Sequence, residues 1–450
     1  MRPIGEALAD RFEGDAKTCT VFWKCGRTAS RDFPRCEPSD NLRNMRLVSV
    51  GQSGSCAVAL MHINRPERYS MSVAKQDFGL KEPDGQHPDT ACLPLHVEEI
   101  TASWLTSALA HGREGVAVES LTIDDVMYGT ATKVRVHPAY NATGRELGLP
   151  ESLIVKGGFV PEYRKLNAYI YEYEARFFRE VHPHLRANVP ACFYAETDAR
   201  TGQSIVILED LRSREVEFCR VQKPLTFAQA AANLDAQARW HAQFWESPAL
   251  DNGGELAWLA PQDPLPDGES GTYHWGQLKP DVFASYTKLP RGAALPKRFH
   301  DRDWMERALL SLRAFDQVGP MTFLHGDVHL GNLYFDHDGT PGFLDWQSYR
   351  RGPWAHDVTY FLISALDIAD RAKWERTLLE HYLERLAFYG VNNPPSIESA
   401  LDAYRRHIVY GLFFWLVNPV EWQAEVNNCA VAPRFAMAAL DHQIYDLVGQ

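Results

Sequence analysis

The sequence predicts an α+β protein with two lobes, and three observations lead to this class. Between residues 116 and 211, short runs rich in β-branched and aromatic residues are separated by turn residues, which is typical of strands. After Leu211 the chain reads as a series of helices. A length of 450 residues exceeds what one hydrophobic core usually holds. Together these features favour a strand-rich lobe followed by a helical lobe.

The strand-rich lobe is predicted over residues 96–211 and opens with an amphipathic helix at residues 97–110. Five strands of an antiparallel sheet are then expected over residues 116–130, 131–140, 152–159, 192–196 and 204–211. One helix, residues 165–185, lies between the third and fourth strands. Its inward face is predicted from apolar residues at helical spacing, namely Leu166, Ile170, Tyr173, Phe177 and Val181.

The helical lobe is predicted over residues 212–450. A long helix at residues 226–245 comes first, and the Pro- and Gly-rich segment 248–296 is interpreted as an insertion or loop. Further helices are expected over residues 354–369, 371–389, 397–417 and 430–447.

Residues 1–95 are predicted to be a poorly ordered N-terminal extension, because they carry scattered Cys, Arg, Pro and Gly without strand or helix periodicity. The eight cysteines of the chain form no CxxC pair and resemble no zinc module. The first residues lack the pattern of a signal peptide, and no apolar run approaches the roughly 18–20 residues that span a bilayer. The sequence therefore predicts a cytoplasmic protein with no membrane partner.

The net charge of −12 argues against a nucleic-acid partner, because such binding depends on a basic surface. Hydrophobic and charged fractions of 45% and 23% match a soluble globular protein. The oligomeric state cannot be read from the sequence.

The stretch FLHGDVHLGNLYF, residues 323–335, carries the strongest functional signal. Polar groups interrupt an apolar run there, and buried polar groups need partners. His325, Asp327 and Asn332 reproduce the spacing H-x-D-x-x-x-x-N, and Asp345 follows at the end of another short apolar strand. Phosphoryl transfer to a hydroxyl group needs these residue types.

In that chemistry the three residues have two predicted roles. Asp327 is the expected catalytic base, which accepts or orients the proton of the attacking hydroxyl. Asn332 and Asp345 supply the oxygen ligands that Mg²⁺ prefers. The predicted cofactors are therefore ATP and Mg²⁺.

The opposite side of the phosphates needs a cation, and Lys156 at the end of the third strand is the candidate. A buried ammonium is costly without a partner. Glu174 lies within the apolar stripe of the following helix and is the expected partner, with Glu180 as second choice.

Two weaker predictions concern the rest of the nucleotide. The backbone N–H groups near Gly129 and Thr130 are expected to cover the phosphates. Adenine is expected to bind backbone groups near Glu209 and Leu211.

The segments HGDVHLGN, FLDWQ and HDVTYFL together resemble the aminoglycoside phosphotransferase and choline kinase superfamily, nearest the ecdysteroid-kinase-like small-molecule kinases. The resemblance covers roughly residues 97–450. It implies a protein-kinase-like fold, ATP and Mg²⁺ as cofactors, and phosphorylation of a hydroxyl on a small-molecule substrate. It gives Asp327, Asn332, Asp345, Lys156 and Glu174 the roles described above.

Two further residues are expected to support the site. His325 is predicted to make hydrogen bonds that fix the loop. Asp357 precedes an apolar helix, so it is expected to cap that helix, and the resemblance implies that it also anchors the catalytic loop. The chain departs from the family pattern in two ways. The expected phosphate loop has one glycine, Gly129, where a glycine-rich loop is typical, and the chain has a long N-terminal extension.

Other interpretations of the same residues stay open. His325, Asp327 and His329 share one face of an extended strand and could bind a transition metal in a hydrolase. The chain could also be a catalytically silent, kinase-like nucleotide-binding module. Trp415 and Trp422 could line a cage for a cationic substrate, although helical spacing favours a core position for them.

Overall fold

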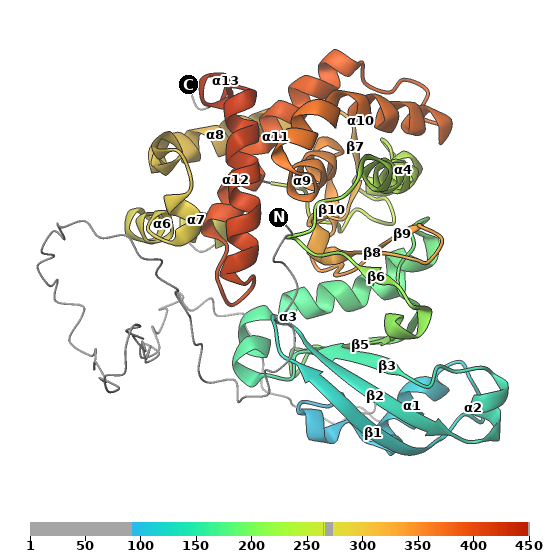
Figure 1. Ribbon diagram of the computed structural model, residues 1–450. Coiled ribbons are helices and arrows are strands. Elements are labelled where there is room, and N and C mark those ends of the chain that lie inside the picture. The colour runs from blue at the N-terminus through green and yellow to red at the C-terminus, as the bar shows by residue number, and fades with distance from the viewer. Residues whose placement is uncertain (1–91, 264, 266–272, 449–450) are drawn as a thin grey trace, which may run out of the picture. The chain divides into compact units, whose positions relative to one another are not determined.

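The computed structural model describes residues 92–263, residue 265 and residues 273–448 of the chain. All of them belong to one compact unit, residues 76–450. The predicted α+β class is confirmed: a five-stranded antiparallel sheet precedes a mostly helical lobe (Figure 1). Most of the predicted N-terminal extension lies outside the described residues, which begin at Cys92.

The sheet has the strand order β1-β2-β3-β5-β4, and every neighbouring pair is antiparallel. Its strands are β1 (Val118–Met127), β2 (Thr132–Tyr140), β3 (Leu153–Gly157), β4 (Cys192–Asp198) and β5 (Gln203–Glu209). Three helices accompany it, namely α1 (Ala102–Ala110), α2 (Ala142–Glu146) and α3 (Pro161–Arg176). The short helix α2 was not predicted from the sequence.

The two faces of the sheet carry different side chains, as the period of two along a strand requires. Val134, Val136, Leu153 and Val155 lie on one face and pack in a hydrophobic core with α1. Lys133 of β2 and Lys156 of β3 lie on the other face and are directly opposite each other in the strand register. Helix α3 covers the part of that face formed by β4 and β5 and lies between the sheet and the helical lobe (Figure 1).

The predicted inward face of α3 is wrong at its N-terminal end. Leu166 is 52% exposed, whereas Tyr171, Glu174 and Ala175 are buried. The cause is local: Asn167 has non-helical dihedrals (φ −122°, ψ 16°), which changes the phase of the helix. From Phe177 to Val181 the chain continues as a π-helix, so a fixed spacing of 3.6 residues does not describe the whole segment.

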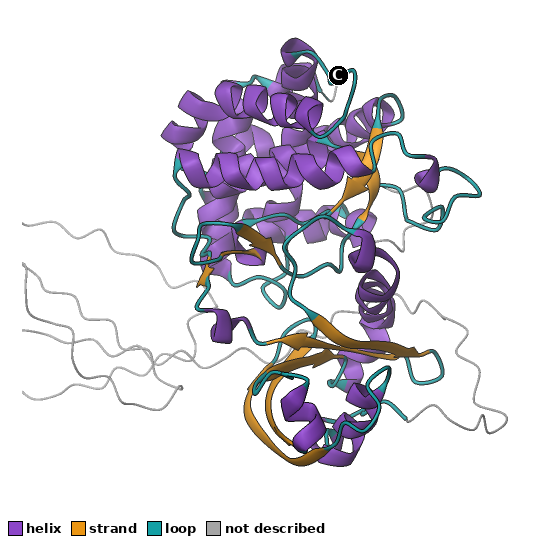
Figure 2. Cartoon of the chain, turned by 90° about the vertical axis from the view of Figure 1, so that its right-hand side faces the viewer, coloured by secondary structure: helices purple, strands orange, loops and turns teal. Residues whose placement is uncertain are grey.

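The helical lobe contains more helices than the sequence predicted, and Figure 2 shows them stacked on the side of the molecule away from the sheet. Those that match predictions are α4 (Phe227–Gln243), α9 (Ala355–Ala365), α10 (Ile368–Phe388), α11 (Ile397–Val417) and α12 (Glu425–Asp441). Those that were not predicted are α5 (Tyr273–Gln277), α6 (Pro280–Thr287), α7 (Pro290–Ala293), α8 (Arg302–Asp316) and α13 (Ile444–Leu447).

The interpretation of residues 248–296 as a loop is therefore wrong for the part that α5, α6 and α7 occupy. These helices are only one or two turns long, and α6 and α7 each begin at a proline. Proline fits the first helical turn, where its missing N–H group costs nothing. The same residue that indicates a loop therefore also begins short helices.

Five short strands carry the loops of the helical lobe. Strand β7 (Met321–Leu324) pairs with β10 (Arg350–Pro353), and β8 (Leu333–Phe335) pairs with both β6 (Glu217–Phe218) and β9 (Pro341–Phe343). The loops after β7 and β9 contain Asp327 and Asp345. Within the described residues, no helix combines the length and apolar character needed to cross a membrane.

Gly411 is expected to limit how closely α11 and α12 pack. A Cβ atom at Gly411 would lie 2.0 Å from a ring carbon of Phe435, which is fully buried. We expect Gly411→Ala to lower the free energy of unfolding by about 1–3 kcal/mol, because overpacking outweighs the gain in helix propensity. Chemical denaturation measures this change.

Gly276→Ala is the matched control, because Gly276 also lies in a helix but has no neighbouring atom within 4 Å of an added Cβ. It should leave stability unchanged or raise it by up to about 1 kcal/mol. Equal effects of the two substitutions would contradict the close packing at Gly411.

Candidate active site

The loop after β7 is held by one buried carboxylate. Asp357, in the first turn of α9, accepts hydrogen bonds from the backbone N–H groups of His325 (2.7 Å) and Gly326 (2.9 Å). Its side chain is fully buried, and His241 Nε2 of α4 lies 3.5 Å from it. Asp357 therefore connects the loop to the core of the helical lobe.

Gly326 occupies a position that no other residue fits. Its φ of +82° lies in the left-handed region, and an added Cβ would lie 2.1 Å from the carbonyl oxygen of Ser348. The glycine thus lets the loop that carries Asp327 approach the loop after Asp345.

Two histidines use their ring nitrogens within these loops. His325 Nε2 contacts the carbonyl oxygen of Leu344 at 2.9 Å, and its Nδ1 faces the N–H group of Asp327 at 3.3 Å. His329 Nδ1 accepts from the N–H group of Gly331 at 3.0 Å, and its Nε2 lies 3.6 Å from Asp327 Oδ2. Both rings therefore orient the backbone rather than point into free space.

Asn332 is fixed against Asp327. Its Nδ2 donates to the Asp327 carbonyl oxygen at 2.9 Å and to Asp327 Oδ2 at 3.2 Å. The amide nitrogen is thereby directed at Asp327, which leaves Asn332 Oδ1 as the atom that can ligate a cation. Burial of Asn332 keeps this orientation well defined.

Asp345 follows β9 and has a φ of +61°, which is uncommon for a residue other than glycine. The N–H group of the preceding residue, Leu344, donates to the carbonyl oxygen of Asn332 at 2.8 Å. The two loops are thus joined by backbone hydrogen bonds. Strained backbone of this kind concentrates at functional sites.

Lys156 connects the sheet to two acidic residues, Glu174 of α3 and Asp345 of the loop after β9. Its Nζ lies 2.6 Å from Glu174 Oε1 and 3.0 Å from Asp345 Oδ1. The second oxygen of Glu174 accepts from Gln347 Nε2 at 2.9 Å. Lys156 and Glu174 are both buried, so each charge has a partner where an unpaired charge would be costly.

The charges around Lys156 and Asp345 reinforce one another. Burial by itself lowers the pKa of Lys156, but the negative charges of Asp345 and Glu174 outweigh it and leave the pKa raised. Burial raises the pKa of Asp345, and the positive charges of Lys156 and Lys133 overcome this and lower it to about 2. Asp345 is therefore a carboxylate at neutral pH.

Asp327 differs from Asp345 in its electrostatic surroundings. Burial, followed by the negative charge of Asp345, raises the pKa of Asp327 to about 8, against the hydrogen bonds from Tyr360 and Asn332. The two carboxyl groups are thus close enough to repel each other, which is the electrostatic condition of a site that binds cations.

Lys133, Gln347, Arg350 and Tyr360 were not among the residues predicted from the sequence. Lys133 could have been found only from the strand register, which pairs it with Lys156. Gln347 lies two residues after Asp345, in a segment without the periodicity of a strand or helix that could have predicted its orientation. Tyr360 looks like an ordinary core residue of α9, because it is buried with the rest of that helix.

The predicted phosphate loop lies between β1 and β2. Tyr171 of α3 donates its hydroxyl to the carbonyl oxygen of Thr130, which ties the loop to the helix that carries Glu174. Neither Gly129 nor Thr130 has a positive φ. A phosphate bound there would accept hydrogen bonds from backbone N–H groups of residues with negative φ.

The predicted adenine contacts lie where β5 ends. The backbone N–H group of Glu209 already donates to the carbonyl oxygen of Ala191, and its side chain binds Arg214 at 2.9 Å. Leu211 is buried at the start of a 3-10 turn. The Glu209 N–H group is therefore occupied within the protein.

Trp415 and Trp422, the two residues considered for a cation cage, differ in their exposure to solvent. Trp415 is fully buried, with its ring 5.2 Å from that of His329. Trp422 is 41% exposed and stacks on Tyr273 at 4.7 Å. Trp415 is thus a core residue beneath the catalytic loop.

The metal-hydrolase interpretation finds no support in this geometry. His325 uses both ring nitrogens in the loop, as described above. In the part of the chain that the structure describes, no group of three or more His, Cys, Asp or Glu side chains could hold a metal ion.

Comparison with known protein families decides the enzyme class. Residues 170–391, which include Glu174, Asp327, Asn332 and Asp345, match the model of the phosphotransferase enzyme family. The predicted resemblance to phosphotransferases is confirmed. The matched region begins within α3, so Lys156 and the first three strands lie outside it. The narrower resemblance to the ecdysteroid-kinase-like branch stays a prediction.

Several solved structures are similar to this phosphotransferase-like chain. A macrolide 2′-phosphotransferase type I is 16% identical with a TM-score of 0.40, covering 73% of this chain and 96% of that protein. A putative aminoglycoside phosphotransferase from Ralstonia eutropha is 15% identical with a TM-score of 0.43 (77% and 99% covered). A spectinomycin phosphotransferase in complex with ADP and spectinomycin is 13% identical with a TM-score of 0.45 (77% and 99% covered). No curated protein matches the chain.

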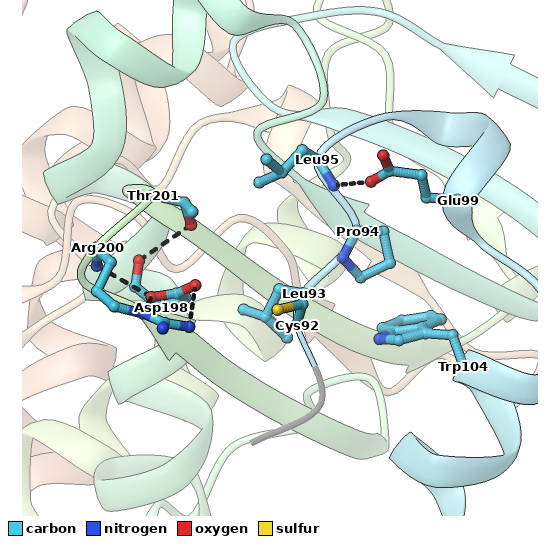
Figure 3. Close-up of a pocket in the computed structure, with 9 residues that line it drawn as sticks. All are labelled: Cys92, Leu93, Pro94, Leu95, Glu99, Trp104, Asp198, Arg200 and Thr201. Atoms are coloured by element: carbon cyan, nitrogen blue, oxygen red, sulfur yellow. Dashed lines mark hydrogen bonds and ion pairs between the residues drawn. The ribbon is translucent and has the colours of Figure 1, made fainter. Parts of the chain in front are cut away.

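A separate pocket of about 520 Å³ lies beside the turn between β4 and β5 (Figure 3). It is lined by the first described residues together with Trp104 of α1 and Arg200 of the β4–β5 turn. Its polar groups pair with one another: Arg200 Nε lies 3.1 Å from Asp198, and Glu99 accepts from the Leu95 N–H group at 2.7 Å. The pocket contains none of the candidate catalytic residues.

Asp357→Asn should weaken the loop that carries Asp327. An amide offers one acceptor oxygen where the carboxylate offers two, so one buried N–H group loses its partner at a cost of about 1–3 kcal/mol. We expect a lower free energy of unfolding, measured by denaturant titration.

Asp251→Asn, at an exposed position after a 3-10 turn, makes the same chemical change without a buried partner and should have no measurable effect. If Asp357→Asn were as stable as this control, the loop would not depend on Asp357.

Proposed function

We propose that the protein transfers the γ-phosphoryl group of ATP to a hydroxyl group of a small molecule. The observation that carries this proposal is the convergence on Asp345: Lys156 of the sheet binds it at 3.0 Å, and the loop of Asp327 and Asn332 is hydrogen-bonded to the residue before it. A phosphotransferase needs a cation, metal ligands and a base within one site, and three distant parts of the chain supply them here. The family match supports the reaction class.

The donor set fits a hard divalent cation such as Mg²⁺. Asn332 directs its nitrogen at Asp327 and so offers Oδ1, and Asp345 is ionised and offers the oxygen that Lys156 does not bind. Amide and carboxylate oxygens are the ligands that Mg²⁺ prefers. When bound, the Mg²⁺ complex of ATP supplies the activated phosphoryl group.

Lys156 and Lys133 are suited to bind the phosphates of the nucleotide. Lys156 is held in place by Glu174, which in turn is held by Gln347. Lys133 is exposed and opposite Lys156 in the strand register. Two cations on one face of the sheet compensate for a phosphate loop that has only one glycine.

Asp327 is suited to orient the acceptor hydroxyl and, in the ionised form that a bound cation favours, to accept its proton. Asn332 and Tyr360 hold the carboxyl group by hydrogen bonds, so its position is fixed before the substrate binds. Such positioning supplies much of the rate enhancement in phosphoryl transfer. Asp357, His325 and Gly326 act through the loop and are positioning residues.

A catalytically silent nucleotide-binding module is the second candidate, because the same cations and metal ligands bind a nucleotide without transferring a group. The fixed position of Asp327 favours an enzyme, since nucleotide binding alone does not need that carboxylate. Substitution of Asp327 separates the two.

Asp327→Asn is expected to lower kcat by about 10²–10⁴-fold, because the amide cannot accept the hydroxyl proton. Affinity for Mg²⁺–ATP should stay within a few-fold of the original protein. ADP release with a panel of alcohols measures the first quantity, and titration calorimetry measures the second. Asp338→Asn, in the exposed turn after β8, is the matched control and should retain full activity. A fully active Asp327→Asn variant would refute the role of the base.

Asp345→Asn tests the metal ligand without disturbing the backbone, because asparagine tolerates the positive φ found at this position. We expect nucleotide binding to lose its dependence on Mg²⁺, since the variant has lost a charged ligand. Nucleotide affinity measured with and without Mg²⁺ checks this. An unchanged Mg²⁺ dependence would mean that Asp345 serves only as the partner of Lys156.

A further inference from the structure

Arg350 is a cation in the active site that the proposed chemistry does not use. It begins β10, five residues after Asp345, and its side chain is half-buried. Its Nε donates to the carbonyl oxygen of Ser348 at 2.8 Å, and the same Nε would lie 3.3 Å from a Cβ atom at Gly326. Arg350 thus lies directly beside the catalytic loop.

The charge of the Arg350 guanidinium group is not paired in an ion pair within the described part of the chain. Among the residues that the structure describes, no carboxylate forms an ion pair with it. The Arg350 side chain is half-buried, and the planar donors of a guanidinium group match a carboxylate or a phosphate. This group is therefore prepared to bind an anion.

Its position indicates which anion it meets. The Nε of Arg350 lies beside Gly326, the residue before Asp327. Arg350 interacts electrostatically with Asp327, with Tyr410 of α11 and His274 of α5, and also with Tyr169 and Tyr173 of α3. The positive charges acting on Asp345, by contrast, come from Lys156 and Lys133 of the sheet. Arg350 thus belongs to the side of the site where the hydroxyl acceptor meets Asp327.

Aromatic rings extend this side of the site. The ring of Tyr410 lies 6.0 Å from that of Tyr360, which holds Asp327, and 5.8 Å from that of Phe414. His274 lies 6.3 Å from Phe414, and both are half-buried. Burial, together with the charge of Arg350, lowers the pKa of His274 to about 4, so its ring is neutral at neutral pH.

We propose that the acceptor is an alcohol that carries an anionic group on an apolar, ring-containing body, with the anionic group bound by Arg350. This inference rests on the proposed phosphotransferase function. The half-buried rings of His274 and Phe414 receive the apolar body, Asp327 receives the hydroxyl group, and Arg350 pairs with the negative charge. An acceptor with an ammonium group is repelled by Arg350, because like charges interact strongly where water is excluded.

The test compares three probes that share a benzyl alcohol body and carry a negative, a neutral or a positive substituent: 3-(hydroxymethyl)benzoate, 3-(hydroxymethyl)benzamide and 3-(aminomethyl)benzyl alcohol. Their 2- and 4-substituted isomers vary the distance between the hydroxyl and the charged group. Binding is measured by titration calorimetry on the full chain in the presence of Mg²⁺–ADP, so no turnover is needed. In at least one isomer series the benzoate should bind about tenfold more tightly than the benzamide, and the amine most weakly.

Arg350→Gln should remove the preference for the benzoate, and Arg350→Lys should restore part of it. Arg239→Gln is the matched control, because it removes the same charge from an exposed position on α4 and should keep the preference. Thermal unfolding of each variant verifies that it is folded.

The inference is overturned if, in every isomer series, the benzamide or the amine binds at least as tightly as the benzoate, or if no probe binds. It is also overturned if Arg350→Gln weakens Mg²⁺–nucleotide binding and leaves the benzoate preference intact, because Arg350 would then serve the nucleotide. A protein that binds no Mg²⁺–ADP at all refutes the proposed function itself. A protein that binds Mg²⁺–ADP but prefers the amine refutes only the identity of the acceptor.

Discussion

The contact between Lys156 and Asp345 is the interaction on which the site depends. These residues are 189 positions apart in the chain, and Lys156 Nζ lies 3.0 Å from Asp345 Oδ1. The contact joins one face of the sheet to the loop after β9. Glu174 holds the same ammonium group from α3, so three elements meet at one buried charge. Because a buried ion needs partners on all sides, this cluster fixes the sheet, α3 and the catalytic loops relative to one another. Every chemical role proposed for the site assumes that arrangement.

A second buried charge performs the corresponding task within the helical lobe. Asp357 binds two consecutive N–H groups of the loop that carries Asp327, and Gly326 allows that loop to approach the carbonyl oxygen of Ser348. The two clusters leave Asp327 and Asp345 as neighbours with opposite properties. Asp345 is stabilised as a carboxylate by two lysines, whereas burial and the charge of Asp345 raise the pKa of Asp327. In the proposed reaction, Asp345 is the metal ligand and Asp327 is the base.

The sheet side and the acceptor side of the site also differ in how their cations are used. On the sheet, Lys156 has two carboxylate partners, Glu174 and Asp345, and its proposed role is to bind the phosphates. Beside the loop of Asp327, Arg350 donates its Nε to the carbonyl oxygen of Ser348, and no carboxylate of the described residues forms an ion pair with it. In the proposed reaction Lys156 serves the phosphates, whereas Arg350, which has no carboxylate in an ion pair among the described residues, recognises the acceptor. Selection of the acceptor would then depend on a residue outside the motif that defines the reaction.

The sequence by itself determined the α+β class, the five strands and the reaction class, because these depend on local periodicity and on the fixed spacing of Asp327, Asn332 and Asp345. It also indicated Lys156 and Glu174, since a charge within an apolar pattern needs a partner. It did not reveal the exposed N-terminal part of α3, because a kink at Asn167 and a π-helix break the helical period. The short helices α5, α6 and α7 were hidden by prolines that indicate turns and helix starts alike. Only the tertiary structure decided that Lys133 lies opposite Lys156 and that Arg350 lies beside the catalytic loop without a carboxylate partner. Those relations depend on strand register and on contacts between distant segments, which no local pattern encodes.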